Sequence, residues 1–575
     1  MKISMFPYIA AFAGMGMSLA GCANDDTNNN NDNKQPPVHE GDKVKPNIIV
    51  ILVDDMGYSD LGCYGSEIET PNIDRLAANG IRFRTFYNSA RSSPTRASLL
   101  TGLYPHQVGY GSLVTIPEYP NYQSYANENN VFIPEVLKNA GYFSVMTGKW
   151  HLGVNRVSPG SRDFDRSLNG AAGGFYYYND ATLNNNGRPT SETSLYLNDQ
   201  LITFTDSRLP ANWYSTDLWV EMGLKMIDEA VREEKPFFWY LAHNAPHFPL
   251  QAPPETIAKY RGRYSSGFDA IRNARFKRQQ DMGFFLPTDK LTPRNPHPGN
   301  KKWENMSAGE RDISDNRMAI YAATIDEIDK STGKLLDYLE EKGILENTVI
   351  LFLSDNGGNA ETGFPGRWEG TNPSGGGVNS LVWLGAPWAD VANTPYFLYK
   401  HHGHEGGCNT PLIIHYPAGI AQSLRGTIDK ENFGHVIDIM PTILELTGAT
   451  YPRNRNGATV PIYEGTSLLP ALSGGKINRT APIIVEHEGN KMLRDGDWKV
   501  VQEFELIEAP WRLYNMRNDP TEMNDLAGTN PEKLTEMVGK YKRWADWTGV
   551  ESSHQFATQY FSVGNWYVPV RDYFQ

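Results

Sequence analysis

The stretch Asn47–Val53 (NIIVILV) decides the fold, because this continuous run of aliphatic, mostly β-branched residues ends abruptly at Asp54-Asp55. Such a run is typical of a strand that is covered on both faces, as in a parallel sheet. Two further runs, Phe237–Leu241 and Thr348–Leu353, have the same form and also stop at polar residues. The sequence therefore predicts several buried strands whose ends carry polar side chains.

Helical patterns alternate with these strands. Apolar residues recur at helical spacing in Val131–Ala140, Ser215–Glu234 and Arg317–Lys342. This alternation predicts an α/β fold, with a large mixed or parallel sheet flanked by helices and a ligand site beyond the carboxyl ends of the strands. Residues 258–312 are rich in Lys, Arg, Asn and Pro, and we expect a long irregular insertion there.

A second, smaller unit is predicted after about residue 465. Strand signals occur at Ile483–Val485, Trp498–Val501 and Leu513-Tyr514, and a helical pattern follows near Pro531–Trp547. This spacing predicts a small antiparallel sheet with one helix. We therefore expect a main α/β domain over residues 46–464 and a C-terminal subdomain over residues 465–575.

The N-terminus is expected to lie outside the fold. Residues 1–22 have the form of a secretory signal that ends in Leu19-Ala20-Gly21-Cys22, which resembles the bacterial lipobox. In that motif the cysteine becomes the lipidated first residue, so Cys22 would begin the mature chain. Residues 23–45 contain almost nothing to bury and are expected to form a disordered tether. We therefore expect an exported lipoprotein of a Gram-negative bacterium, anchored by lipid in the periplasm or at the outer membrane and cell surface.

Charge and cysteine content exclude some classes of function. The chain of 575 residues carries 53 Lys and Arg against 66 Asp and Glu, a net charge of −13, so nucleic acid is not expected as a partner. Three cysteines are too few for a disulfide framework or a zinc cluster built on thiolates.

The segment that begins at Arg91-Ser92 is the strongest candidate for chemistry. Ser92 is followed by Pro94, which suits a first helical turn, and the pattern closes at Gly102. We therefore expect Ser92 at a helix N-terminus, where the helix dipole favours an anion, with Arg96 reaching back to the same place. The alternative is that Ser92 only caps an ordinary helix.

The whole pattern, Ser92-x-Pro94-x-Arg96 followed by Leu100-Thr101-Gly102, resembles the signature of the formylglycine-dependent sulfatases. Other short segments also resemble landmarks of that family, and they follow in the family's order: 46–55, 70–74, 148–153, 245–247, 354–357 and 405–407. Within the family, which belongs to the alkaline-phosphatase-like superfamily, the sequence is most similar to the bacterial arylsulfatase type. The resemblance implies a sulfuric ester hydrolase. It also implies that Ser92 is oxidised to 3-oxoalanine (formylglycine) by a maturase, which for the Ser form is an anaerobic radical enzyme.

The resemblance implies one calcium ion. The matching positions are Asp54, Asp55, Asp355 and Asn356, together with the modified Ser92. The chemistry agrees, because carboxylate and amide oxygens suit a hard cation, and adjacent buried carboxylates repel each other without one.

The resemblance also assigns the catalytic groups. Lys149 and Lys400 would bind the sulfate, Arg96 would support the nucleophile, His151 would break the covalent sulfate intermediate and His247 would protonate the leaving alcohol. Lys149 and His151 lie two apart after a predicted strand, so we expect them to face the same way. Near Lys400 an alternative remains open, in which the histidines at 401, 402 and 404 form a surface metal site.

The predicted function is hydrolysis of a sulfate monoester, and export favours a sulfated carbohydrate as the substrate. Two alternatives stay open. The chain could hydrolyse a phosphoester or phosphonate, or it could be a silent glycan-binding lipoprotein in which Ser92 is never oxidised.

Overall fold

The computed structural model describes residues 45–551 except 114, 116–118, 154–155, 172, 180–193, 297–298, 362–365, 367, 371–374, 379 and 505–508. The predicted signal segment, all of the predicted tether before Lys45 and residues 552–575 lie outside this part of the chain. In the part that is described, no helix is both long and apolar enough to cross a membrane.

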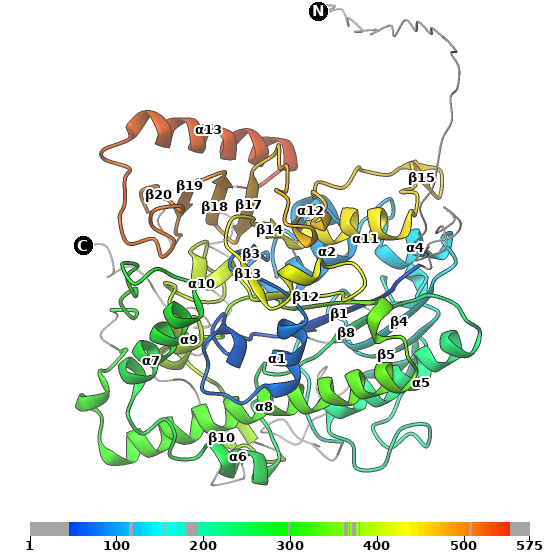
Figure 1. Ribbon diagram of the computed structural model, residues 1–575, viewed down its shortest axis with the longest axis horizontal. Coiled ribbons are helices and arrows are strands. Elements are labelled where there is room, and N and C mark those ends of the chain that lie inside the picture. Colours follow the sequence, from blue (N-terminus) through cyan, green and yellow to red (C-terminus); the bar gives the residue numbers. More distant parts are fainter. Residues whose placement is uncertain are drawn as a thin grey trace, which may run out of the picture. The chain divides into compact units, whose positions relative to one another are not determined.

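A ten-stranded mixed sheet forms the centre of the fold, in the order β13-β2-β12-β9-β1-β8-β4-β5-β6-β7 (Figure 1). In chain order its strands are β1 (Asn47–Val53), β2 (Gly80–Phe83), β4 (Phe143–Lys149), β5 (Arg166–Gly170), β6 (Leu195–Leu197), β7 (Gln200–Ile202), β8 (Phe237–Ala242), β9 (Thr348–Ser354), β12 (Leu412–His415) and β13 (Thr427–Asp429). The five strands from β9 to β5 run parallel, so their carboxyl ends meet at one edge.

Helices cover both faces of this sheet. They are α1 (Pro71–Ala78), α2 (Ser92–Thr101), α3 (Pro105–Val108), α4 (Ile133–Lys138), α5 (Ser215–Arg232), α6 (Pro254–Tyr260), α7 (Phe268–Met282), α8 (Ala308–Glu341), α9 (Ala386–Ala392), α10 (Glu405–Cys408), α11 (Ile439–Thr447) and α12 (Leu469–Leu472). Figure 1 shows α2 and α11 above the central strands and α8 below them.

The central strand β1 is buried on both faces, which explains its continuous apolar sequence. Its odd-numbered residues from Ile49 to Val53 join the apolar cluster that contains α1, α5 and α8. Its even-numbered residues from Ile48 to Leu52 join the cluster that contains α2, α4 and α11. The polar residues that follow β1 are therefore held at the end of the most deeply buried part of the fold.

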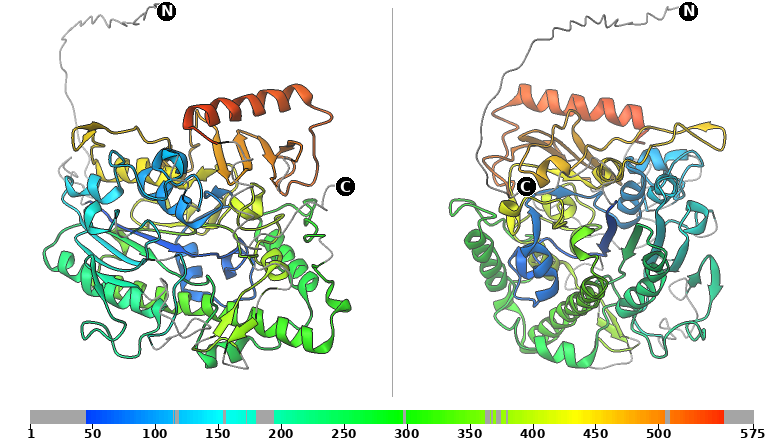
Figure 2. Two further views of the ribbon diagram at one scale, coloured as in Figure 1. Left: turned by 180° about the vertical axis from the view of Figure 1, so that it is seen from behind. Right: turned by 45° about the vertical axis from the view of Figure 1, so that its right-hand side comes forward.

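The predicted C-terminal antiparallel sheet is present. It has four strands, β17 (Ile483–His487), β18 (Asn490–Asp495), β19 (Trp498–Gln502) and β20 (Arg512–Asn515). Helix α13 (Pro531–Thr548) packs on it through Met537, Tyr541 and Trp544, and Figure 2 shows α13 on the outer side of this sheet. Three short pairs complete the strands: β3 (Phe86–Tyr87) with β14 (Gly434–His435), β10 (Trp368–Gly370) with β11 (Ser380–Val382), and β15 (Asn454–Arg455) with β16 (Ala458–Thr459).

The expectation of an irregular insertion over residues 258–312 is wrong. Helix α7 lies within it, and α8 begins at Ala308, nine residues before the predicted helix at Arg317. The buried face of α7 is mixed: fully buried Arg275 and Gln279 lie among Phe268, Ile271 and Phe276, and Nη1 of Arg275 lies 2.6 Å from Oδ1 of Asp60. Because polar and charged residues interrupt the buried face, the apolar periodicity of α7 is weak in the sequence.

Candidate active site

The polar residues that follow β1 and β9 meet at one edge of the sheet. Val53 is paired with Ser354 in the parallel ladder, so Asp54 and Asp55 lie beside Asp355 and Asn356. All four side chains are fully buried. The amide nitrogen of Asn356 donates to Oδ1 of Asp55 at 2.6 Å, and the backbone N–H of Asp55 donates to Oδ1 of Asp355 at 3.2 Å. The predicted metal-binding set is therefore brought together.

Ser92 is the first residue of α2 and points into this group. Its hydroxyl donates to Oδ1 of Asp54 at 3.1 Å and lies 3.4 Å from Oδ1 of Asn356. The residue in the N-cap position is Arg91, so Ser92 does not cap the helix. The Ser92 side chain instead makes its contacts with the acidic group, as a residue with a chemical role would.

Arg96 follows one turn later on α2 and is completely buried. Its guanidinium donates to Oδ2 of Asp355 at 2.8 Å and to the carbonyl oxygen of Lys149 at 2.9 Å, and it lies 3.7 Å from Oδ1 of Asp54. Arg96 therefore holds the acidic residues and the end of β4 in a fixed arrangement.

Two lysines from distant parts of the chain each pair with one of the two adjacent aspartates. Nζ of Lys149, the last residue of β4, lies 2.5 Å from Oδ2 of Asp54. Nζ of Lys400 lies 2.8 Å from Oδ1 of Asp55. Burial lowers the pKa of Lys149. At Lys400 burial also acts to lower the pKa, but the charges of Asp55 and Glu361 together raise it. Two buried cations beside one hydroxyl form a site for the oxygens of an anion.

His247 also approaches Asp55, with Nε2 3.5 Å from Oδ2 of that residue. Its Nδ1 lies 2.6 Å from the carbonyl oxygen of Phe248, a contact that places a proton on Nδ1 and aims Nε2 at the site. Burial lowers the pKa of His247 to about 3, and the charge of Asp55 opposes this shift.

His151 follows β4, but its backbone has a φ of 54°. The alternation of an extended strand therefore does not apply, and the expectation that His151 faces the same way as Lys149 has no basis in the local backbone. Burial, and then the charges of Lys149 and Arg96, lower the pKa of the His151 ring well below its usual value. A Cβ atom at Gly173 would lie 2.8 Å from Nε2 of His151, so this ring needs a glycine beside it.

A second layer of charged groups surrounds Lys400, and the sequence motifs did not indicate it. Nη1 of Arg91 lies 2.6 Å from Oε1 of Glu361, and Oε2 of Glu361 lies 3.4 Å from Nζ of Lys400. The Asn359 amide donates to Oδ2 of Asp55 at 2.5 Å. Burial would raise the pKa of Glu361, but Arg91 and Lys400 lower it to about 2. In the sequence, only nearness to the predicted site residues could have indicated Arg91 and Asn359, because Arg91 adjoins Ser92 and Asn359 closely follows Asn356.

The acidic group fits a hard divalent cation. Asp54, Asp55 and Asp355 are fully buried carboxylates, and the amide oxygen of Asn356 adds a neutral oxygen donor. Burial raises the pKa of Asp355 to about 6, and the charge of Asp54 adds to this effect. Repulsion between these carboxylates is what a bound cation would relieve, and oxygen donors suit calcium or magnesium.

The histidines that follow Lys400 do not form a surface metal site. His401, His402 and His404 are all buried. Nδ1 of His402 lies 2.5 Å from Glu503, and Nδ1 of His404 lies 2.9 Å from Glu522. Both partners belong to the C-terminal part of the chain, so these histidines connect it to the segment that carries Lys400.

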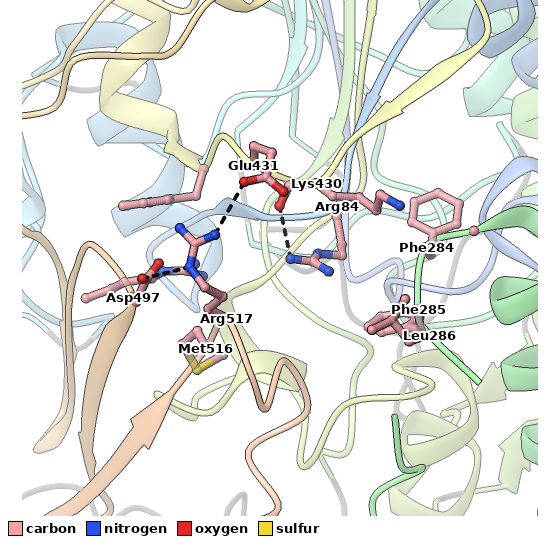
Figure 3. A pocket seen from close by; sticks show the side chains of 12 residues that line it. Arg84, Phe284, Phe285, Leu286, Lys430, Glu431, Asp497, Met516 and Arg517 are labelled. Atoms are coloured by element: carbon pink, nitrogen blue, oxygen red, sulfur yellow. Dashed lines mark hydrogen bonds and ion pairs between the residues drawn. The ribbon is translucent and has the colours of Figure 1, made fainter. Parts of the chain in front are cut away.

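A cavity of about 190 Å³ lies elsewhere and shares no lining residue with this site. It is lined in part by Arg84, Lys430 and Arg494. Figure 3 shows Arg517 between Asp497 and Glu431. Nε of Arg517 lies 2.8 Å from Oδ2 of Asp497, and its Nη1 lies 3.7 Å from Oε2 of Glu431. The cavity is therefore separate from the group around Ser92.

Comparisons with known proteins agree with this geometry. Residues 46–449 match the family model described as Sulfatase, and residues 396–543 match the model described as N-sulphoglucosamine sulphohydrolase, C-terminal. An uncharacterised sulfatase of Schizosaccharomyces pombe is 34% identical, over 89% of this chain and 95% of its own. An arylsulfatase of Klebsiella aerogenes is 34% identical, over 71% of this chain and 88% of its own. The solved structure of Ps i-CgsB in complex with k-i-k-neocarrahexaose is 26% identical, with a TM-score of 0.64, and the match covers 88% of this chain and 93% of that chain.

Proposed function

This chain belongs to the sulfatase family and hydrolyses sulfate esters, and we propose that it does so with an oxidised Ser92 and one calcium ion. The proposal rests on one observation above all. The hydroxyl of Ser92, at the buried start of α2, lies 3.1 Å from Asp54, which in turn contacts Lys149. A nucleophile, a metal ligand and an anion-binding cation thus share one small volume.

Oxidation of Ser92 to formylglycine would solve a chemical difficulty. A plain serine hydroxyl is a weak nucleophile near neutral pH unless a base or a metal activates it. The hydrated aldehyde would supply one hydroxyl that attacks sulfur, its proton passing to Asp355, and a second hydroxyl that would later give up its proton and become the C=O bond, which expels the sulfate. The signature around Ser92 is also what a formylglycine-generating maturase of the anaerobic radical type would read.

Calcium would be held by Asp54, Asp55, Asp355 and Asn356, with the side chain at position 92. When bound, a divalent cation there supplies positive charge to the sulfuryl oxygens and to the nucleophilic oxygen. Arg96 keeps Asp355 and the end of β4 in register with this group, through its bonds of 2.8 and 2.9 Å.

The remaining steps are assigned to side chains of this chain. Lys149 and Lys400 bind the sulfate oxygens and stabilise the charge that develops on them. We propose that His247 acts here in its doubly protonated form, with Nδ1–H held by Phe248, so that the bound substrate must raise the pKa of His247 from about 3. Its Nε2–H then goes to the departing alcohol, and the S–O bond breaks without forming an alkoxide. His151 then takes the proton of the remaining hydroxyl at position 92, which expels sulfate and restores the aldehyde.

A sulfated glycan is the proposed substrate. A structurally similar protein was solved with k-i-k-neocarrahexaose, and the predicted lipoprotein signal favours a substrate met outside the cytoplasm. We propose that the mature chain begins at Cys22 and that its lipid anchor holds the enzyme in the periplasm or at the cell surface.

One experiment separates this function from its alternatives. The protein is expressed with and without a maturase that accepts serine, and each sample is assayed on an aryl sulfate and on the matching aryl phosphate. We expect turnover of the sulfate only after co-expression. Preferred turnover of the phosphate would indicate a phosphoester hydrolase. No turnover of either ester, with Ser92 left unoxidised even after co-expression, would indicate a silent glycan-binding protein. A panel of monosulfated saccharides then identifies the sugar.

A further inference from the structure

Outside the site around Ser92, three side chains that can bind metal converge between the Lys400 segment and the C-terminal sheet. His401 follows Lys400, His487 ends β17, and Glu488 comes next. Their donor atoms all lie within 4.8 Å of one another, and all three side chains are buried. None of the three belongs to the acidic group at the ends of β1 and β9.

The distances in this cluster suit a small cation. Nε2 of His487 lies 3.4 Å from Oε1 of Glu488, and Nδ1 of His401 lies 3.7 Å from Oε2 of Glu488. A tetrahedral zinc ion with bonds of about 2.0–2.1 Å separates its ligand atoms by roughly 3.4 Å. The cluster therefore needs little rearrangement to surround one ion.

His487 gives an independent reason to expect a ligand. Its side chain is fully buried, and neither ring nitrogen makes a hydrogen bond within the described part of the chain. Buried polar atoms without partners are rare, because such atoms lose their contacts with water and gain nothing in return. A metal ion would satisfy the nitrogen of His487 that faces Glu488.

We propose that His401, His487 and Glu488 form a second metal site, which binds one transition-metal ion such as Zn²⁺. Two imidazoles and a carboxylate favour zinc, whereas the all-oxygen group around Asp54 favours calcium. Burial, followed by the charge of Arg91, lowers the pKa of both rings well below the usual value, so the rings are in the neutral form that binds metal.

The proposed ion would fasten the Lys400 segment to the C-terminal sheet. The backbone N–H of His401 donates to the carbonyl oxygen of Ala90 at 3.0 Å, two residues before Ser92. Of the other two ligands, His487 is the last residue of β17 and Glu488 is the next residue. The ion would thus join the catalytic part of the chain to the sheet that contributes no group to the site around Ser92.

The test uses the full-length protein, stripped of metal with a chelator, dialysed and then saturated with calcium. Co²⁺ is titrated in as a spectroscopic probe, and Zn²⁺ is added afterwards. We expect one equivalent of Co²⁺ to bind with the visible absorption of a site of low coordination number, and Zn²⁺ to displace it. If the calcium-saturated protein binds no Co²⁺ in this way, the second site does not exist.

Variants locate the site. His487→Ala should weaken Co²⁺ binding by at least about tenfold and leave the calcium content unchanged. Glu488→Gln keeps the size of the side chain and should weaken binding as well, which covers the case in which His487→Ala does not fold. His415→Ala, which removes another buried histidine at the end of β12, should leave Co²⁺ binding unchanged. Undiminished binding in both cluster variants would overturn the proposal. Since the readouts are absorption and metal content, failure here leaves the sulfatase function untouched.

Discussion

His247 lies within the site, with its Nε2 3.5 Å from Oδ2 of Asp55. Its proton matters most when the leaving group is a poor one, because a phenolate departs without help. His247→Ala should therefore slow hydrolysis of a sugar sulfate far more than hydrolysis of nitrophenyl sulfate. The measurement is kcat/KM on both substrates. Equal losses on the two substrates would show that His247 binds the substrate and does not donate a proton.

Glu361 is the partner that Arg91 and Lys400 share, and its removal should be costly. Glu361→Gln removes the carboxylate that pairs with buried Arg91, while Lys400 keeps Asp55, and breaking a buried pair costs about 3–5 kcal/mol. The free energy of unfolding in urea measures this loss. The double variant with Arg91→Gln should recover part of the stability, since it removes the stranded charge. If the losses of the two single variants simply add, the Arg91–Glu361 pair does not contribute as described.

At the scale of elements, the paired ends of β1 and β9 create the proposed calcium site. Chelation followed by dialysis should abolish turnover, and calcium should restore it better than zinc, because the ligands are oxygens. Asp54→Ala and Asp355→Ala should each lower the calcium content measured by elemental analysis. Restoration by zinc alone would contradict the metal assignment, and unchanged calcium content in both variants would show that other residues bind the ion.

The sequence predicted the elements that bury mainly apolar side chains. The strand at Asn47–Val53, three of the four strands of the C-terminal sheet and helix α13 follow from apolar runs or helical spacing. Strand β18 was not predicted, because four of its six residues are polar. Helix α7 was missed because buried Arg275 and Gln279 occupy its inner face, and a window of sequence reads such residues as exposed. The start of α8 did carry a signal, since Ser307 and Glu310 form a capping box.

The sequence predicted the site residues that belong to local motifs. It did not predict the residues that long-range packing brings to the site. Ser92, Arg96 and the acidic pairs belong to local patterns, and the structure brings them together. Glu361 and Arg91 meet across a large separation in sequence, which no spacing rule describes. The orientation of His151 depends on one positive φ, and the rule of alternating strand faces gives no indication of that.

At the scale of the whole molecule, a buried ionic network holds the C-terminal sheet to the main domain. Nζ of Lys499 lies 2.6 Å from Glu405 and 2.7 Å from Glu522. Lys499→Met should lower the free energy of unfolding by about 3–5 kcal/mol, since it leaves two buried carboxylates without their cation. Lys533→Met, which removes a half-exposed lysine from α13, is the matched control and should cost about 1 kcal/mol or less. Equal effects of the two changes would mean that the network does not stabilise the junction.

The replacement of Ser92 concerns the activity of the whole enzyme. Because Ser92 does not cap α2, Ser92→Ala should cost only the hydrogen bond to the Asp54 carboxylate, about 1.5–3 kcal/mol. We expect a folded protein without activity in any host. Ser92→Cys should be active in a host whose maturase oxidises only cysteine. Activity assays beside urea unfolding curves check both expectations, and an active Ser92→Ala would remove position 92 from the mechanism.

Oxidation of Ser92 can be measured by peptide mass spectrometry of the same sample whose sulfatase activity is assayed. We expect active protein to lack one pair of hydrogens at Ser92 and carbonyl reagents to label this residue. We also expect activity to rise in proportion to the modified fraction. Full turnover of a sulfate ester by protein with an unmodified Ser92 would contradict this mechanism and indicate catalysis by a plain hydroxyl.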